Sequence, residues 1–149
     1  MAHANLGKHH GVEDQGWVAH FIIASVLKRQ LSIYGNGKQV RDLLHVRDLI
    51  HAYEIGFGKM DELTGEAFNV GGGPQNTLSI WEEFGPLLEE VSGRQTAVSY
   101  GDWRPGDQPV FIADIRKAAE KLGWQPQISP VDGVLELYNW VNENQPLFK

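Results

Sequence analysis

Apolar side chains recur three and four positions apart along several stretches of the chain, which is the spacing of helices that bury one face. We expect a first helix from residue 14, capped by Asp14, to about residue 29, and a second from residue 48 to about residue 58. A third is expected over residues 79–93, where Ser79 and Glu82 have the spacing of a capping box. Pro86 lies inside this third pattern and predicts a break between residues 82 and 86.

The C-terminal part of the chain predicts two further helices. Asp114 is expected to cap one that ends at Gly123, and Ser129, followed by Pro130, is expected to cap the last. The apolar stripe predicted for this last helix comprises Val131, Val134, Leu135, Tyr138 and Val141.

Shorter runs of apolar and β-branched residues predict strands. Leu31 to Tyr34 and Gln39 to Val46 flank the sequence Gly35-Asn36-Gly37, whose residues tolerate positive φ, so these two runs predict a β-hairpin. Further strands are expected at residues 66–70, 96–100 and 110–113. Such a mixture of helices and strands is α/β, with too few strands for an independent doubly wound sheet.

Composition narrows the class of protein. The chain has 149 residues, of which 42% are hydrophobic and 21% charged, as in ordinary globular domains. We expect a flexible N-terminal arm over residues 1–10 and one domain over residues 11–149. No apolar run approaches the roughly 20 residues that span a bilayer, and no secretion signal is recognisable, so a cytoplasmic location without membrane contact is expected.

Charge and residue usage exclude several kinds of chemistry. A net charge of -6 and the lack of Lys and Arg clusters interleaved with aromatics argue against nucleic-acid binding. The absence of cysteine removes disulfides, thiol nucleophiles and thiolate metal sites, and the six histidines show no HExxH or similar spacing, so no metal site is expected. A small anionic ligand would need a local arginine site, and Arg41, beside the glycine-rich turn, is suited to a phosphate.

Four motifs occur in order along the chain. They are GVEDQGWVAHFI at residues 11–22, IYGNGKQVRDLLHVRDL at 33–49, FNVGGGPQNTLS at 68–79 and GDWRPGDQ at 101–108. Together they resemble the C-terminal half of the NAD-dependent epimerase/dehydratase family of extended short-chain dehydrogenases, and within it the CDP-paratose (CDP-tyvelose) 2-epimerases. The resemblance implies the substrate-binding lobe of such an enzyme, the part that holds the nucleotide-sugar, without its NAD-binding Rossmann domain.

The departures from the family pattern concern catalysis. No strand, glycine-rich loop and helix with the dinucleotide fingerprint occurs in the sequence, so we expect no NAD site in this chain. Tyr34 and Lys38 have the spacing of the family's catalytic Tyr-x-x-x-Lys pair, but a glycine-rich turn separates them, whereas the pair requires a helix. No catalytic residue is therefore assigned.

The resemblance implies that Arg41 and Arg104 contact the diphosphate or ribose of the ligand. Two guanidinium groups from separate loops can hold a diphosphate by charge-assisted, bidentate hydrogen bonds. The alternative is that each arginine is a surface group paired with Asp42 or Asp107.

Four more residues complete the predicted substrate site. Tyr34 and Gln39 flank the turn and are expected to border the base, and Trp103, next to Arg104, is the tryptophan expected to stack on a base or sugar. Asp107 either reaches a ligand hydroxyl or holds the turn of its loop, and the second role is favoured. The glycines at residues 71–73 are expected to form a tight strand-to-helix connection rather than a phosphate cradle. The remaining tryptophans, Trp17, Trp81, Trp124 and Trp140, are expected in the core.

Two functional hypotheses follow. In the first, the chain binds a nucleotide-sugar, most simply a CDP-sugar, is not catalytic alone, and binds no cofactor itself; its partner would be a separate Rossmann-domain chain. In the second, the chain is a self-associating interaction module, a homo-oligomer with a vestigial ligand site, which buries apolar surface that formerly met the missing domain.

Overall fold

Helices and short strands alternate along the part of the chain that the computed structural model describes, residues 16–148. The helices are α1 (Trp17–Val26), α2 (Val46–Gly58), α3 (Phe84–Ser92), α4 (Pro130–Glu143), the π-helix η2 (Ala118–Leu122) and the 3₁₀ helix η3 (Gln145–Phe148). The strands are β1 (Leu31–Tyr34), β2 (Val40–Asp42), β3 (Thr77–Ser79), β4 (Val98–Gly101) and β5 (Val110–Phe111). The expected arm over residues 1–10 and the expected cap Asp14 lie outside the described residues.

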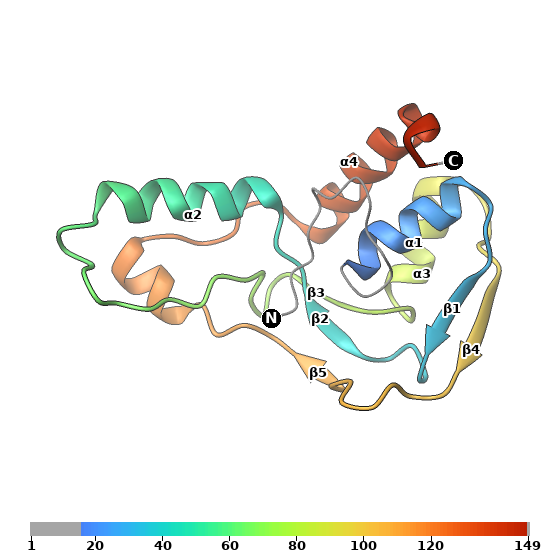
Figure 1. Ribbon diagram of the computed structural model, residues 1–149, viewed down its shortest axis with the longest axis horizontal. Coiled ribbons are helices and arrows are strands. Elements are labelled where there is room, and N and C mark those ends of the chain that lie inside the picture. Colours follow the sequence, from blue (N-terminus) through green and yellow to red (C-terminus); the bar gives the residue numbers. More distant parts are fainter. Residues whose placement is uncertain (1–15, 149) are drawn as a thin grey trace.

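These elements form an elongated molecule (Figure 1). At one end α1, α3 and α4 pack together beside β1 and β4, and we call this part the helical lobe. At the other end α2, residues 59–70 and η2 form an extension that we call the arm. Strands β2, β3 and β5 lie between the two, so they connect the arm to the helical lobe. This arrangement is the mixed α/β fold that the sequence predicts.

The strands belong to two separate sheets, and the predicted hairpin is wrong. Strand β1 pairs in parallel with β4, with Leu31 opposite Val98, while β2 lies between β3, antiparallel, and β5, parallel. The turn itself forms as expected, because Gly35 and Gly37 have φ of 81° and 75°. The chain does not fold back on β1, however, since the backbone hydrogen bonds of β1 and β2 are made to segments tens of residues further along.

The helical lobe has the larger of the two hydrophobic cores. Helix α1 inserts Phe21 and Ile22 between α3, which contributes Phe84 and Leu88, and the rest of the lobe. The aromatic rings meet edge to face, with the Trp17 and Phe84 centroids 5.0 Å apart. Of the tryptophans expected in the core, Trp124 is fully buried and Trp17 and Trp81 are partly buried, whereas Trp140 packs on Phe148 at the surface.

The arm has a smaller core of its own. It consists of Ala52 from α2, Ala118 and Leu122 from η2, and Trp124. Phe68 and Val70 pack against this cluster, but residues 66–70 form no strand, so this prediction is wrong. A strand requires a neighbour to complete its hydrogen-bond ladder, and within the described residues no strand pairs with this segment.

Two helix predictions need correction. The third helix begins at Phe84 rather than at residue 79, so Pro86 falls in its first turn, where a missing donor is tolerated. Ser79 instead ends β3, and it exchanges hydrogen bonds with Glu83 rather than Glu82: the Ser79 amide donates to the carboxylate at 2.6 Å and the Glu83 amide to the hydroxyl at 2.8 Å.

The last helix begins as predicted, since the Ser129 hydroxyl accepts a hydrogen bond from the Asp132 amide. Its predicted stripe is only partly right. Val134 and Val141 are buried and Tyr138 is partly buried, whereas Val131 and Leu135 are 52% and 44% exposed. Packing against α1 selects the face that also carries Leu137, and Val131 and Leu135 lie outside that face.

Candidate functional site

The middle strand β2 places Arg41 in the interior of the molecule. Arg41 is only 9% exposed, and its guanidinium donates to the Val40 carbonyl at 2.8 Å and to an Asp107 carboxylate oxygen at 2.6 Å. The alternative stated above, an ion pair with Asp107, is therefore formed, but the arginine is buried and is not a surface group. A buried charge held by one carboxylate costs desolvation energy, which a structural role alone does not repay in every protein.

Asp107 is the residue that joins the predicted site together. One carboxylate oxygen accepts from Arg41, and the other accepts from the Gln39 side-chain amide at 3.3 Å. The backbone of Asp107 closes a turn on Arg104, with the amide 3.1 Å from the Arg104 carbonyl. Asp107 therefore fixes the loop after β4 onto β2, which agrees with the turn-holding role favoured from the sequence.

Gln39 is fully enclosed, at 1% exposure, yet half of its amide has no partner. Its Nε2 donates to the Tyr34 carbonyl at 2.6 Å and to Asp107, and these acceptors fix the orientation of the amide. Its Oε1 is the buried side-chain oxygen that, within residues 16–148, makes no hydrogen bond. An unpaired buried acceptor is costly, so Gln39 has a hydrogen-bonding position available beside the arginine–carboxylate pair.

Aromatic and cationic groups form the rim of this cluster. The Arg104 guanidinium carbon lies 3.9 Å from the centre of the Tyr34 ring, a cation–π contact, and Trp103 is 44% exposed in the same loop. Gly35 is required here, because a Cβ at this position would lie 2.6 Å from Gln39 Nε2 and 2.9 Å from the Trp103 ring, at a φ of 81°. The structure thus brings all six predicted site residues to one end of β1 and β2.

The triglycine at residues 71–73 is packed against the chain. A Cβ at Gly72 would lie 2.1 Å from the Leu43 carbonyl oxygen, and one at Gly71 would lie 2.6 Å from an Asp42 carboxylate oxygen. Asp42 also accepts from the Gly73 amide at 3.0 Å. These glycines permit close packing and lead into β3 rather than a helix, so they do not fit the pyrophosphate of a dinucleotide.

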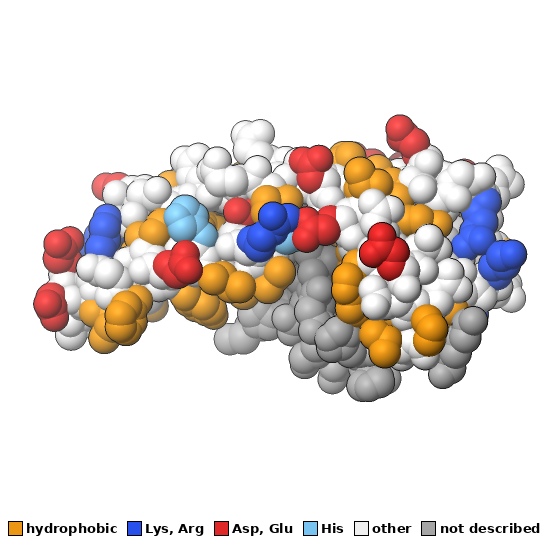
Figure 2. Space-filling view, turned by 90° about the horizontal axis from the view of Figure 1, so that it is seen from above, with side chains coloured by type: hydrophobic (Ala, Val, Ile, Leu, Met, Phe, Trp, Pro, Cys, Tyr) orange, Lys and Arg blue, Asp and Glu red, His pale blue; other side chains and the backbone are white. Residues whose placement is uncertain are grey.

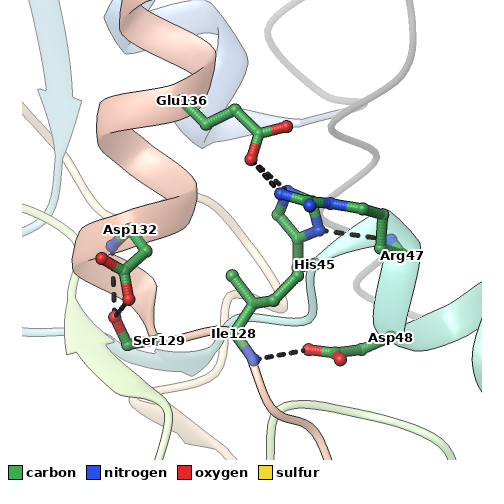
Figure 3. A network of polar contacts seen from close by, with 7 residues as sticks. All are labelled: His45, Arg47, Asp48, Ile128, Ser129, Asp132 and Glu136. Atoms are coloured by element: carbon green, nitrogen blue, oxygen red, sulfur yellow. Dashed lines mark hydrogen bonds and ion pairs between the residues drawn. The ribbon is translucent and has the colours of Figure 1, made fainter.

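A second polar cluster lies where α2 meets α4 (Figure 3). His45 is buried, and its Nδ1 accepts from the Arg47 amide at the start of α2, while its Nε2 lies 3.8 Å from a Glu136 carboxylate oxygen. Arg47 forms an ion pair with the same carboxylate. Burial lowers the pKa of His45 below 6.5, and the Arg47 charge acts in the same direction, whereas Glu136 and Asp48 oppose it.

Asp48 belongs to the same junction. Its carboxylate accepts from the Ile128 amide at 3.0 Å, and its carbonyl accepts from the Trp124 indole at 3.0 Å, so the first turn of α2 holds the segment before α4 (Figure 3). The sequence analysis did not find this cluster, because histidine is not among the usual N-cap residues. Its partners lie about ninety positions away, and no local pattern indicates them.

Neither cluster has the composition of a metal centre. Within residues 16–148 no group of three or more His, Asp or Glu side chains could hold a metal ion. The helices of the same region are also too short or too polar to cross a membrane. The chemistry available in the first cluster is therefore the binding of a polar, anionic ligand by Arg41, Arg104 and Gln39 beside exposed aromatic rings.

Comparisons with known proteins agree on one class, the enzymes that modify nucleotide-sugars. CDP-paratose 2-epimerase of Salmonella typhi is 38% identical over 141 residues, which are 91% of this chain and 41% of that protein. UDP-glucuronate 4-epimerase of Thermodesulfobacterium geofontis is 32% identical over 122 residues. The structure superimposes on UDP-glucose 4-epimerase from Thermotoga maritima, solved with UDP-glucose, with a TM-score of 0.78 and 28% identity, over 93% of this chain and 42% of that one.

The fold is accordingly that of the substrate-binding lobe of an extended short-chain dehydrogenase. The sequence matches the GDP-mannose 4,6 dehydratase family over residues 8–137, and the chain belongs to this family of epimerases and dehydratases. It spans about two-fifths of the length of the relatives named here and corresponds to their C-terminal part.

Proposed function

We propose that this chain binds a nucleotide-sugar as the substrate lobe of an NAD-dependent epimerase or dehydratase, and that the ligand is a CDP-sugar. The observation that carries the proposal is the Gln39–Asp107–Arg41 cluster, in which a buried arginine and an unpartnered amide oxygen lie below an aromatic rim. The cytidine assignment is supported by the name of the Salmonella relative.

Each residue then has a defined task. Arg104, at the rim, and Arg41, at the floor, donate to the diphosphate, while Asp107 holds Arg41 in place and brings the Arg104 loop onto β2. Gln39 Oε1 accepts from a hydroxyl or amino group of the nucleoside, and Trp103 and Tyr34 offer ring faces to the base.

NAD is held elsewhere in this proposal. The triglycine of this chain is filled by its own packing, and the family's hydride chemistry belongs to a dinucleotide-binding portion. UDP-glucuronic acid 4-epimerase from Bacillus cereus, solved with both UDP-glucuronic acid and NAD, superimposes over only 38% of its length, with a TM-score of 0.76. We therefore expect the pure chain to bind nucleotide-sugars without forming NADH or epimerised sugar.

Isothermal titration calorimetry of the chain with CDP-glucose, CDP and UDP tests this proposal. Hydrogen bonds to charged groups contribute about 1.5–3 kcal/mol, so Arg104→Ala should weaken CDP binding about 10- to 100-fold. Arg41→Lys keeps the charge but loses the planar fork, and it should also weaken binding. Arg116→Ala is the matched control, because Arg116 is a strongly exposed arginine paired with Asp114 on the arm.

The outcomes separate the ligand from the site. No heat with any nucleotide in a folded sample would contradict binding. Unchanged affinity in both Arg104→Ala and Arg41→Lys would leave binding intact but place it somewhere else. Equal affinity for CDP and UDP would remove the cytidine preference.

A further inference from the structure

Helix α2 carries an apolar stripe that faces away from the molecule. Val46, Ile50, Tyr53 and Phe57 are spaced by four, three and four residues, so they share one face, and Met60 continues the line beyond the helix. They are 38%, 49%, 68%, 78% and 59% exposed, respectively. Hydrophobic side chains follow this arm in a row in the space-filling view (Figure 2). The opposite face is already used, because Ala52 and Asp48 pack on η2 and the segment before α4.

Residues 66–70, on the same arm, have the burial pattern of a strand with one covered face. Phe68 and Val70 pack on the arm core, whereas Ala67 and Asn69 point outward. Side-chain contacts fix the segment to the region of η2: Lys117 donates to the Ala67 carbonyl at 2.8 Å, and Asn69 donates to the Asp114 carbonyl at 3.4 Å. Within the described residues no neighbouring strand completes a ladder with it.

A helix followed by a strand is half of the crossover unit from which parallel sheets are built. An exposed segment with strand patterning extends the open edge of another sheet by strand addition, and a helix with an apolar face covers such a sheet. One occupant therefore satisfies both features of the arm, whereas a helix docked on the stripe alone would leave residues 66–70 unpaired.

We propose that the arm docks onto the open edge of a parallel α/β sheet in the dinucleotide-binding portion of an epimerase, with residues 66–70 added as a strand and the α2 stripe buried against it. This inference rests on the proposed function, and it names the partner. The chain spans 41% of its Salmonella relative, so that protein contains a further portion of sufficient size. Two copies of this chain are a poorer occupant, because pairing two such segments makes only a two-stranded ribbon, which is marginal in water.

Co-expression tests the docking. The tagged probe is the part of the Salmonella CDP-paratose 2-epimerase outside its match to this chain, produced with and without the full 149-residue chain. We expect a 1:1 complex by size-exclusion chromatography with light scattering, and slower amide hydrogen exchange at residues 67–70 in the complex. The double variant Tyr53→Glu, Phe57→Glu should weaken the complex at least 10-fold. Val131→Glu with Leu135→Glu, which changes two exposed apolar residues of α4, is the control and should leave it intact.

Three results would overturn the inference. One is that the probe remains alone, or insoluble, whether or not the chain is present. A second is a complex that tolerates the α2 double variant and leaves residues 67–70 unprotected. The third is a homodimer of the chain that is lost in the same variant. Because Arg104→Ala should bind the probe normally while losing CDP affinity, failure of docking and failure of ligand binding are distinguishable.

Discussion

Removing the Asp107 carboxylate should release the loop that carries Arg104 and Trp103. In Asp107→Ala, Arg41 loses the 2.6 Å ion pair and Gln39 loses its 3.3 Å hydrogen bond, so both buried groups are left with fewer partners. Breaking a buried pair from one side costs about 3–5 kcal/mol. The Arg41 and Asp107 side chains retain 11% and 23% exposure, and water relieves part of this cost, so we expect a loss of about 2–3 kcal/mol.

Urea unfolding followed by tryptophan fluorescence measures this loss. With a slope of about 2 kcal/mol per molar urea, the midpoint should fall by about 1–1.5 M. Asp107→Asn keeps the size of the side chain and one acceptor oxygen, and it should give an intermediate loss. Asp102→Ala is the control, because it removes an exposed carboxylate from the same loop and should change the midpoint very little.

The comparison also distinguishes a structural pair from a ligand site. A midpoint for Asp107→Ala within about 0.2 M of that for Asp102→Ala would refute the role of the Arg41–Asp107 pair in holding the loop. Because a ligand that binds only the folded state stabilises it, saturating CDP should raise the midpoint of the wild-type chain, and less so that of Asp107→Ala.

Three further results are expected from the same unfolding assay. Gly72→Ala should destabilise the chain by about 3 kcal/mol, because its Cβ would meet the Leu43 backbone, whereas Gly56→Ala in α2, with open space around it, should stabilise by about 0.5–1 kcal/mol; equal effects would contradict the packing of the triglycine. The folded-state pKa of His45 is lowered by burial, so the neutral form is favoured and its stabilisation, present above pH 6.5, should decline as the pH falls through the folded pKa; His45→Asn, which can still cap α2, should flatten this decline, and an unchanged profile would rule the residue out as its source. Hydrogen bonds from Lys117 and Lys121 lower the pKa of Glu66 to about 2, so its stabilisation is present above pH 4.5 and lost as the pH falls toward 2; Glu66→Gln should show a smaller loss over that interval, and a steeper one would contradict the pairing.

Local signals in the sequence were sufficient wherever a helix end or a turn depends on neighbouring residues. Ser129 and Pro130 begin α4 as expected, Gly93 and Gly123 end their helices at φ of 68° and 72°, and the turn at residues 35–37 has the positive φ that its glycines permit. Each of these features is fixed by contacts within a few positions, which is the range that a sequence pattern describes.

Strand pairing could not be predicted in the same way. A glycine-rich turn between two apolar runs favours a hairpin, but Leu31 pairs with Val98 and Val40 with Val110, choices that depend on which sheet edges are available after the helices pack. The site shows the same limit. The motif resemblance indicated Arg41, Arg104 and Asp107, but the bridging role of Asp107 between Arg41 and Gln39 follows only from the tertiary structure.

The positions of the site and the arm suggest how binding and assembly are divided in this lobe. The ligand cluster is built on β1, β2 and the loop after β4, next to the larger core, so its geometry is fixed by the chain itself. The arm has only a small core and carries both unpartnered features, the α2 stripe and residues 66–70. The two parts meet through β2 and through the His45–Glu136 and Asp48–Ile128 contacts between α2 and the α4 region. Docking at the arm therefore acts on the same strand that carries Arg41, which provides a direct structural connection between a dinucleotide-binding partner and the nucleotide-sugar site.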